Sequence, residues 1–186
     1  MNNIVKLSAT FLVAITFLTG CGSNNNSQVN TPNTISGAKT IYISNSARFA
    51  KNSRIAMNIK KECNLNHQMI DYLKVYGAKN DINFVSTSKL KSKKNTLVIT
   101  IDDAVSSGNA FTGHRKFVTI SGKLKNDGKT YSFKAARQSG GGFMGAYKSS
   151  CAVLGGAVKR LARDTAEWAT FPDNGARLGD QHLLRY

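Results

Sequence analysis

The sequence predicts an α+β domain in which a four- to five-stranded, mainly antiparallel sheet carries two helices packed on one face. Three observations favour this class. Apolar and polar residues alternate in several short segments, as in strands, and apolar residues recur at helical spacing in two longer segments. An Asp-Gly pair joins two of the alternating segments in the manner of a β-hairpin. Residues 39–171 hold these patterns and are numerous enough to bury one core.

The first strand and the first helix follow from different periodicities. Residues 40–44 alternate, which predicts a short strand. Residues 55–73 place apolar side chains at helical spacing and Gly77 offers a stop, so we expect a helix there. This helix is either continuous or interrupted near Asn64 and Asn66.

Two further strands are predicted at residues 82–87 and 96–102, because both segments alternate. In the second strand, the side chains of Leu97, Ile99 and Ile101 would face the core. Its other face would then carry Val98, Thr100 and Asp102.

A two-residue turn at Asp127–Gly128 suits a type I′ hairpin and fixes the register of the strands on either side. In that register the core face carries the pairs Leu124 with Tyr131, Gly122 with Phe133 and Ile120 with Ala135. The opposite face carries Lys125 with Thr130, Lys123 with Ser132 and Ser121 with Lys134. A slip of one residue would invert both faces, so this sorting of apolar from polar residues supports the register. It also places lysines on an open sheet face.

The last helix should begin with Ser149 or Ser150 as its N-cap and end near Thr170. Its core stripe comprises Leu154, Val158, Leu161, Thr165 and Trp168. Its outer face comprises Lys159, Arg160, Arg163 and Glu167. Residues 172–186 show little apolar periodicity, which predicts a loose C-terminal tail.

Residues 1–20 have the parts of an export signal peptide. Lys6 is their only charge, and residues 7–18 form an apolar core too short to span a bilayer. Small residues then lead into Cys21. The run Leu18-Thr19-Gly20-Cys21 resembles the lipobox of bacterial lipoproteins, and the resemblance implies cleavage before Cys21 and acylation of its thiol and new amine.

The resemblance also implies an address. Residues 21–38 would be the lipidated cysteine and a flexible tether, because they contain almost no large apolar side chains. Gly22 and Ser23 lack the aspartate that, in the lipoproteins resembled, retains cargo at the inner membrane. We therefore expect a lipid anchor at the periplasmic face of the outer membrane, with the inner membrane as the alternative.

The three cysteines divide by role. Lipidation would use Cys21 and leave Cys63 and Cys151 as an even pair in an oxidising compartment, where a disulfide is expected. Two buried free thiols are the alternative. No metal-ligand spacing accompanies the pair, so no metal site is predicted.

The chain is strongly basic, with 26 Lys and Arg against 10 Asp and Glu. This excess favours a polyanion such as lipid headgroups, lipopolysaccharide, nucleic acid or an anionic cell-wall polymer. A merely solvated basic surface is the alternative. The candidate contacts are a run between two strands, Lys89, Lys91, Lys93 and Lys94, and the hairpin face, Lys123, Lys125 and Lys134.

A glycine-rich segment, residues 139–149, precedes the last helix. Its glycine spacing approaches that of the phosphate-binding GxxxxGK[ST] loop, but Ala146 and Tyr147 separate the last glycine from Lys148, so the lysine is misplaced. The segment is either a flexible connection or a contact loop. In the second case its contact residues are Phe143, Met144 and Tyr147.

No set of residues predicts catalysis. Asp102 and Asp103 are adjacent, so on a strand they point to opposite faces and cannot readily share a proton. His114 has no serine, cysteine or carboxylate at a recognisable spacing. We expect no enzyme activity, no metal, no cofactor and no small-molecule substrate.

The predicted anchor and the charge together indicate a non-enzymatic binding or assembly component of the cell envelope. In element order and anchor, the chain resembles the small outer-membrane lipoproteins that assist envelope assembly, including the one that plugs the lipopolysaccharide translocon. The resemblance implies an envelope protein as partner. The alternative is a polyanion binder that uses the basic sheet face on lipopolysaccharide or nucleic acid.

Overall fold

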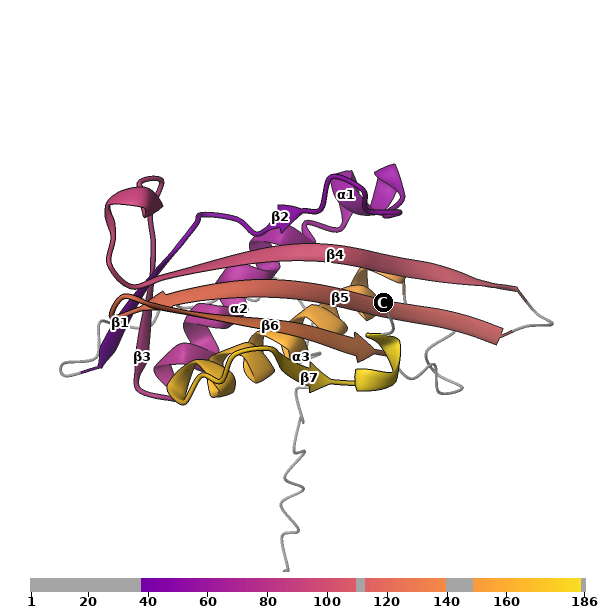
Figure 1. Cartoon of the computed structure of the whole chain (residues 1–186). Coiled ribbons are helices and arrows are strands. Elements are labelled where there is room, and N and C mark those ends of the chain that lie inside the picture. The colour runs from indigo at the N-terminus through magenta and orange to yellow at the C-terminus, as the bar shows by residue number, and fades with distance from the viewer. Residues whose placement is uncertain (1–37, 110–112, 140–148, 185–186) are drawn as a thin grey trace, which may run out of the picture.

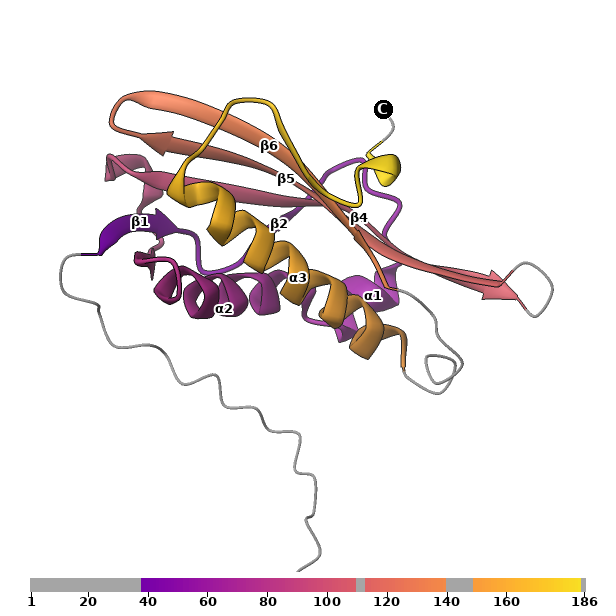
Figure 2. The same ribbon diagram turned by 90° about the horizontal axis from the view of Figure 1, so that it is seen from below.

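A mixed sheet of seven strands forms one layer of the molecule, and helices form the other (Figure 1, Figure 2). This computed structural model describes residues 38–109, 113–139 and 149–184. The strands are β1 (Lys39–Ile43), β2 (Arg48–Phe49), β3 (Ile82–Ser86), β4 (Thr96–Asn109), β5 (Gly113–Asn126), β6 (Lys129–Gln138) and β7 (Ala176–Gly179). Their order is β3-β1-β4-β5-β6-β7, with β2 beside β4.

The α+β class is confirmed, but the prediction of four to five mainly antiparallel strands is wrong in number and in direction. β1 runs parallel to β3 and β4, β2 runs parallel to β4, and β7 runs parallel to β6. β4, β5 and β6 form an antiparallel meander. Local alternation identifies a strand but not its direction, which for β1 and β3 is set by the helical connection between them. β2 and β7 are too short to show a period.

The helices are α1 (Met57–Glu62), α2 (Leu65–Ala78) and α3 (Ser150–Thr170), with 3₁₀ turns η1 (Leu90–Ser92) and η3 (Gln181–Leu183). The interruption near Asn64 is confirmed, because Asn64 adopts φ 48° between α1 and α2, and asparagine tolerates this left-handed conformation. The N-cap of α3 is confirmed at Ser149, whose Oγ accepts from the N–H of Ala152 at 3.2 Å. No helix of the described residues has the length and apolarity to cross a membrane.

The core lies between the sheet and the pair α2 and α3, which pack side by side on one face of it (Figure 2). The predicted core residues of β4, Leu97, Ile99 and Ile101, are at most 2% exposed. All five predicted stripe residues of α3 are buried as well: Leu154, Val158, Leu161, Thr165 and Trp168. Across the two layers, the rings of Phe133 and Trp168 lie 4.6 Å apart between centroids.

The hairpin of β5 and β6 has the predicted turn and register. Asp127 and Gly128 both have positive φ, 49° and 80°, as a type I′ turn requires. The core face carries the predicted pairs Leu124 with Tyr131, Gly122 with Phe133 and Ile120 with Ala135. A Cβ at Gly122 would collide with the ring of Phe133, so this ring occupies the space that a side chain at 122 would need.

The predicted disulfide is confirmed. Cys63 at the end of α1 is bonded to Cys151 in the first turn of α3, with their Cα atoms 4.8 Å apart. The bond therefore ties the approach to α2 to the start of α3. The two helices that cover the sheet are linked covalently at one end.

The prediction of a loose tail over residues 172–186 is wrong for its described part. β7 pairs with β6, and the N–H of Gly175 donates to the carbonyl of Ser132 at 2.8 Å. Beyond β7, the carboxylate of Asp180 accepts from the N–H of Gln138 at 2.6 Å. A four-residue edge strand is too short to be recognised from alternation, and its order depends on a neighbour distant in sequence.

Candidate functional site

The open face is the face of the sheet opposite α2 and α3. In Figure 1 the strands pass in front of both helices, so this face is turned toward the viewer. Because side chains alternate along a strand, the residues between the core residues of β4, β5 and β6 lie on the open face. They are polar or basic in most positions, as predicted for the hairpin.

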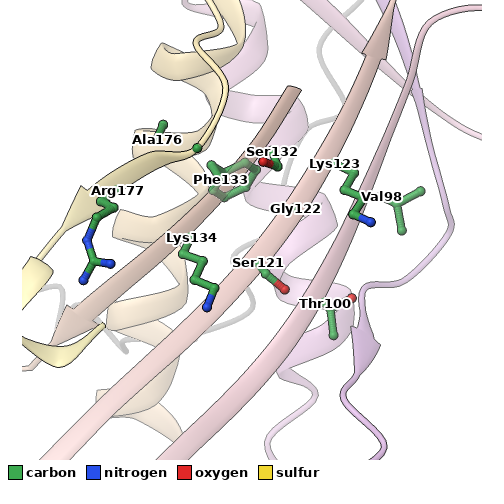
Figure 3. A pocket seen from close by; sticks show the side chains of 11 residues that line it. Val98, Thr100, Ser121, Gly122, Lys123, Ser132, Phe133, Lys134, Ala176 and Arg177 are labelled. Carbon is green, nitrogen blue, oxygen red and sulfur yellow. The ribbon is translucent and has the colours of Figure 1, made fainter. Parts of the chain in front are cut away.

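A groove of about 590 Å³ lies on the open face across β4, β5, β6 and the start of β7 (Figure 3). Its polar lining residues are Thr100, Ser121, Lys123, Ser132, Lys134 and Arg177. Apolar or small lining comes from Val98, Gly122, Phe133, Gly175 and Ala176. The groove therefore combines three cations and three hydroxyls with apolar and small residues.

Register places several of these residues in one cross-strand row. Thr100 pairs with Ser121, Ser121 with Lys134, and Lys134 with Arg177. Arg48 of β2 continues the row beyond Thr100. Neighbouring strands lie about 4.8 Å apart, so the row carries cations at both ends and hydroxyls between them.

Arg177 is the groove cation that sequence reasoning missed, because it lies in the segment predicted to be loose. Its guanidinium donates to the backbone carbonyl of Leu184 at 2.9 Å and lies 3.5 Å from that of Gln181. Carbonyls are neutral, so they orient the guanidinium without cancelling its charge. Residues 172–186 contain two arginines and two aspartates, so their net charge gave no signal, and without a strand Arg177 could not be placed on the sheet.

Asp102 adds a carboxylate beside the groove. A bulge between Ile101 and Asp103 interrupts the pairing of β4 with β5, and Asp102 Oδ1 accepts from Ser121 Oγ at 2.9 Å. Burial raises the pKa of Asp102 above its ordinary value, whereas the hydrogen bond from Ser121 and the charge of Lys134 act in the opposite direction. Asp103 Oδ2 instead lies 3.8 Å from Arg54 Nη2, so the two adjacent aspartates have different partners.

The predicted lysines fall into three groups. Lys123 and Lys134 line the groove, and Lys125 lies one pair beyond Lys123 on the same face. Lys93 reaches the neighbouring part of the sheet, where its Nζ lies 4.5 Å from the ring centroid of Tyr42 on β1. The other residues of the run lie around η1: Lys89 and Lys91 line a second hollow of about 570 Å³, and Lys94 is exposed.

The charges are distributed unevenly. All ten acidic residues lie within the described part of the chain, and none of them lines the groove. Asp164 and Asp180 are bound to Arg137, and Arg163 lies near Glu167. The groove thus keeps an excess of positive charge, which Asp102 reduces at one side only.

Four predicted site residues lie outside the described residues: Cys21, Phe143, Met144 and Tyr147. Among the residues that the structure does describe, no group of three or more His, Cys, Asp or Glu side chains could hold a metal ion.

No family model and no curated protein matches the sequence. Several solved structures are similar in outline. A protein from Xanthomonas campestris of the DUF330 family has a TM-score of 0.47 and 12% identity, over 75% of this chain and 89% of that one. The PelC dodecamer from Paraburkholderia phytofirmans has a TM-score of 0.41 and 7% identity, over 70% and 91%. A minor lipoprotein from Acinetobacter baumannii has a TM-score of 0.39 and 10% identity, over 72% and 93%. At these values the likeness carries no argument about function.

Proposed function

We propose that this chain is a lipid-anchored, non-enzymatic binding or assembly component of the bacterial cell envelope, held at the periplasmic face of the outer membrane. The disulfide between Cys63 and Cys151 is the observation that carries the proposal, because such bonds persist in oxidising compartments and are rare in the cytosol. It agrees with the lipobox-like run that ends at Cys21. Both features support export of the chain.

The open face supports binding as the activity. The helices cover one side of the sheet and leave the other with a groove large enough for a ligand. Its side chains are lysine, arginine, serine and threonine, which position and neutralise a ligand through charge and hydrogen bonds. An envelope protein is the expected partner, through this face or through the segment that contains Phe143, Met144 and Tyr147.

The anchor is tested by replacing Cys21 with serine in the full chain. We expect an uncleaved precursor that incorporates no labelled fatty acid. Cys63→Ser is the matched control, because it removes a cysteine without touching the lipobox and should be labelled normally. Normal labelling of Cys21→Ser would contradict the anchor. In a separate experiment, cross-linking of the native lipidated protein, followed by purification, would identify the protein partner.

A second candidate function is polyanion binding at the open face. The observation that favours it is the groove itself, which Lys123, Lys134 and Arg177 line while no acidic residue does. Clustered cations raise the local concentration of anionic ligands and bind them in a salt-dependent way. A protein partner held by packed apolar contacts would show a weaker salt dependence.

Charge reversal at Lys123, Lys125 and Lys134 tests this second candidate. We expect weaker binding to lipopolysaccharide and to duplex DNA, and a shallower dependence on salt because fewer counterions are released. Titrations at two ionic strengths measure both quantities. Equal affinity of wild type and triple variant for both ligands would contradict polyanion binding and leave a protein partner as the ligand.

A further inference from the structure

We infer that the groove of the open face binds a strand of acidic polysaccharide, a chain of sugars with carboxylate groups. The inference rests on the second candidate function and names the ligand of that same site. Lys123, Lys134 and Arg177 would bind the carboxylates, and the hydroxyls of the groove, with the Asp102 carboxylate beside it, would bind the sugar hydroxyls.

The arrangement of the cations suits regularly spaced single charges. Lys134 and Arg177 are register partners on neighbouring strands, about 4.8 Å apart along the sheet. Lys123 lies on the next strand, β5, two residues beyond Ser121, which is the register partner of Lys134. A polymer with one carboxylate on each sugar presents separated charges to such a set. Both carbonyl contacts of Arg177 are made by Nη2, so Nε and Nη1 remain as charged donors to a carboxylate.

The groups between the cations suit a ligand rich in hydroxyls. Ser121 Oγ donates to Asp102 Oδ1 and retains capacity to accept, while Asp102 is an acceptor alone when ionised. Ser132 Oγ donates to Asn174 Oδ1 at 2.8 Å and keeps its own acceptor capacity. Acceptors of this kind bind O–H donors. A sugar chain carries such donors beside its carboxylates, whereas a polyphosphate carries none.

The same groups disfavour the other anionic polymers. Single-stranded nucleic acid binds through bases stacked on aromatic rings, but the ring of Phe133 is buried against Trp168 and the ring of Tyr42 is covered by Lys93. Asp102 would repel the closely spaced phosphates of a nucleic acid or a polyphosphate more than the carboxylates of a polysaccharide, which are spaced one to a sugar.

The test is a titration of the full, lipidated protein in detergent micelles. The probes are an oligogalacturonate, a neutral oligosaccharide of the same length and an inorganic polyphosphate. We expect the oligogalacturonate to bind more tightly than either of the others at the same ionic strength. Reversal of the two cations of the row that line the groove, Lys134→Glu with Arg177→Glu, should weaken this binding at least about tenfold, which corresponds to about 1.4 kcal/mol.

Two matched variants complete the design. Lys61→Glu with Lys159→Glu changes the same charge on exposed helix positions and should leave the affinity unchanged. Asp102→Asn keeps the side-chain shape but removes the negative charge, so polyphosphate should gain affinity while oligogalacturonate does not. Circular dichroism checks that each variant is folded.

The outcomes separate the inference from the functions on which it rests. Polyphosphate binding as tight as oligogalacturonate binding would overturn the polysaccharide and leave general polyanion binding in place. Absence of binding to all three probes would overturn both. Oligogalacturonate binding that survives reversal at Lys134 and Arg177 would place the ligand elsewhere and overturn the site. None of these outcomes depends on the labelling of Cys21, which tests the anchor alone.

Discussion

Arg137 on β6 donates two hydrogen bonds to the carboxylate of Asp164 on α3, from Nε at 2.7 Å and from Nη2 at 2.9 Å. A third bond, from Nη1 at 3.3 Å, reaches Asp180 beyond β7. The hydrogen bonds and charges of these carboxylates raise the pKa of Arg137 further above its ordinary value. One guanidinium thus connects the sheet, the longest helix and the C-terminal segment.

Arg137→Ala should destabilise the protein by about 3 kcal/mol, because it leaves the buried carboxylate of Asp164 without its charge partner. Chemical denaturation measures the change. Arg163→Ala is the control, since Arg163 is exposed and makes only long contacts, 3.8 Å from Nη2 to Asp164 Oδ1 and 3.8 Å from Nε to Glu167 Oε1, and exposed pairs contribute less than about 1 kcal/mol. Equal losses of unfolding free energy in the two variants would show that the pair of Arg137 with Asp164 stabilises the fold no more than an exposed ion pair does.

Loss of the disulfide should lower the melting temperature substantially. Cys63 and Cys151 are 88 residues apart, and in the chain-entropy model a loop of this size is worth about 4 to 5 kcal/mol, less any strain in the folded state. Thermal melts of Cys63→Ala, Cys151→Ala and the double variant should agree with one another, because each removes the same bond. Two free thiols in protein isolated from the envelope would contradict the bond itself.

Phe133 and Lys134 are neighbours on β6 that should respond oppositely to truncation. Phe133→Ala removes a buried ring packed on Trp168 and should cost about 3 to 4 kcal/mol. Lys134→Ala removes an exposed side chain and should change stability by less than about 0.5 kcal/mol. Urea denaturation of the two variants measures the difference, and comparable losses would mean that the hairpin register is wrong.

Two glycines should also respond oppositely to alanine. Gly122→Ala would place a methyl group against the ring of Phe133 and should destabilise the protein by about 1 to 3 kcal/mol. In Gly156→Ala the added methyl group has no neighbouring atom within 4 Å. Because position 156 is in the middle of α3 and alanine is a better helix former than glycine, the change should stabilise the protein by up to about 1 kcal/mol. Denaturation midpoints test both, and a neutral Gly122→Ala would show that the ring moves at no cost.

Asp102 should give the stability a specific pH dependence. Burial raises its pKa in the folded state, so folding favours the protonated acid, and its contribution weakens as pH rises through the ordinary and then the raised value. Asp102→Asn should therefore melt at a higher temperature than wild type at pH 7. The difference should shrink at a pH well below about 3.9, the ordinary pKa of aspartate, where both side chains are neutral. A difference independent of pH would contradict this cause.

The parts of the fold that sequence predicts are those fixed by local rules. The turn at Asp127–Gly128 determines the hairpin register, and the alternation of β4 determines which of its residues are buried. The disulfide follows from cysteine number and compartment. Strand direction is not encoded locally, so the parallel pairing of β1 and β3 was missed.

The groove was predicted in part for the same reason. Lys123 and Lys134 follow from the hairpin register, whereas Arg177 reaches the groove through β7, an edge strand of four residues. The hydrogen bond between Ser121 and Asp102 depends on the register between β4 and β5, which has a bulge at that point. Neither the position of Arg177 nor this hydrogen bond produces a periodic pattern in the sequence.

The disulfide has a consequence for the thermodynamics of ligand capture. It fixes the first turn of α3, Arg137 holds the helix at Asp164, and Trp168 near its end donates to the carbonyl of Asp173 at 3.2 Å. A helix secured at three points acts as a stiff backing for the strands that form the groove. A ligand then meets side chains on a preorganised surface and spends less of its interaction energy on ordering the receptor. Reduction of the Cys63–Cys151 bond should therefore make binding entropically less favourable even under conditions where the protein stays folded.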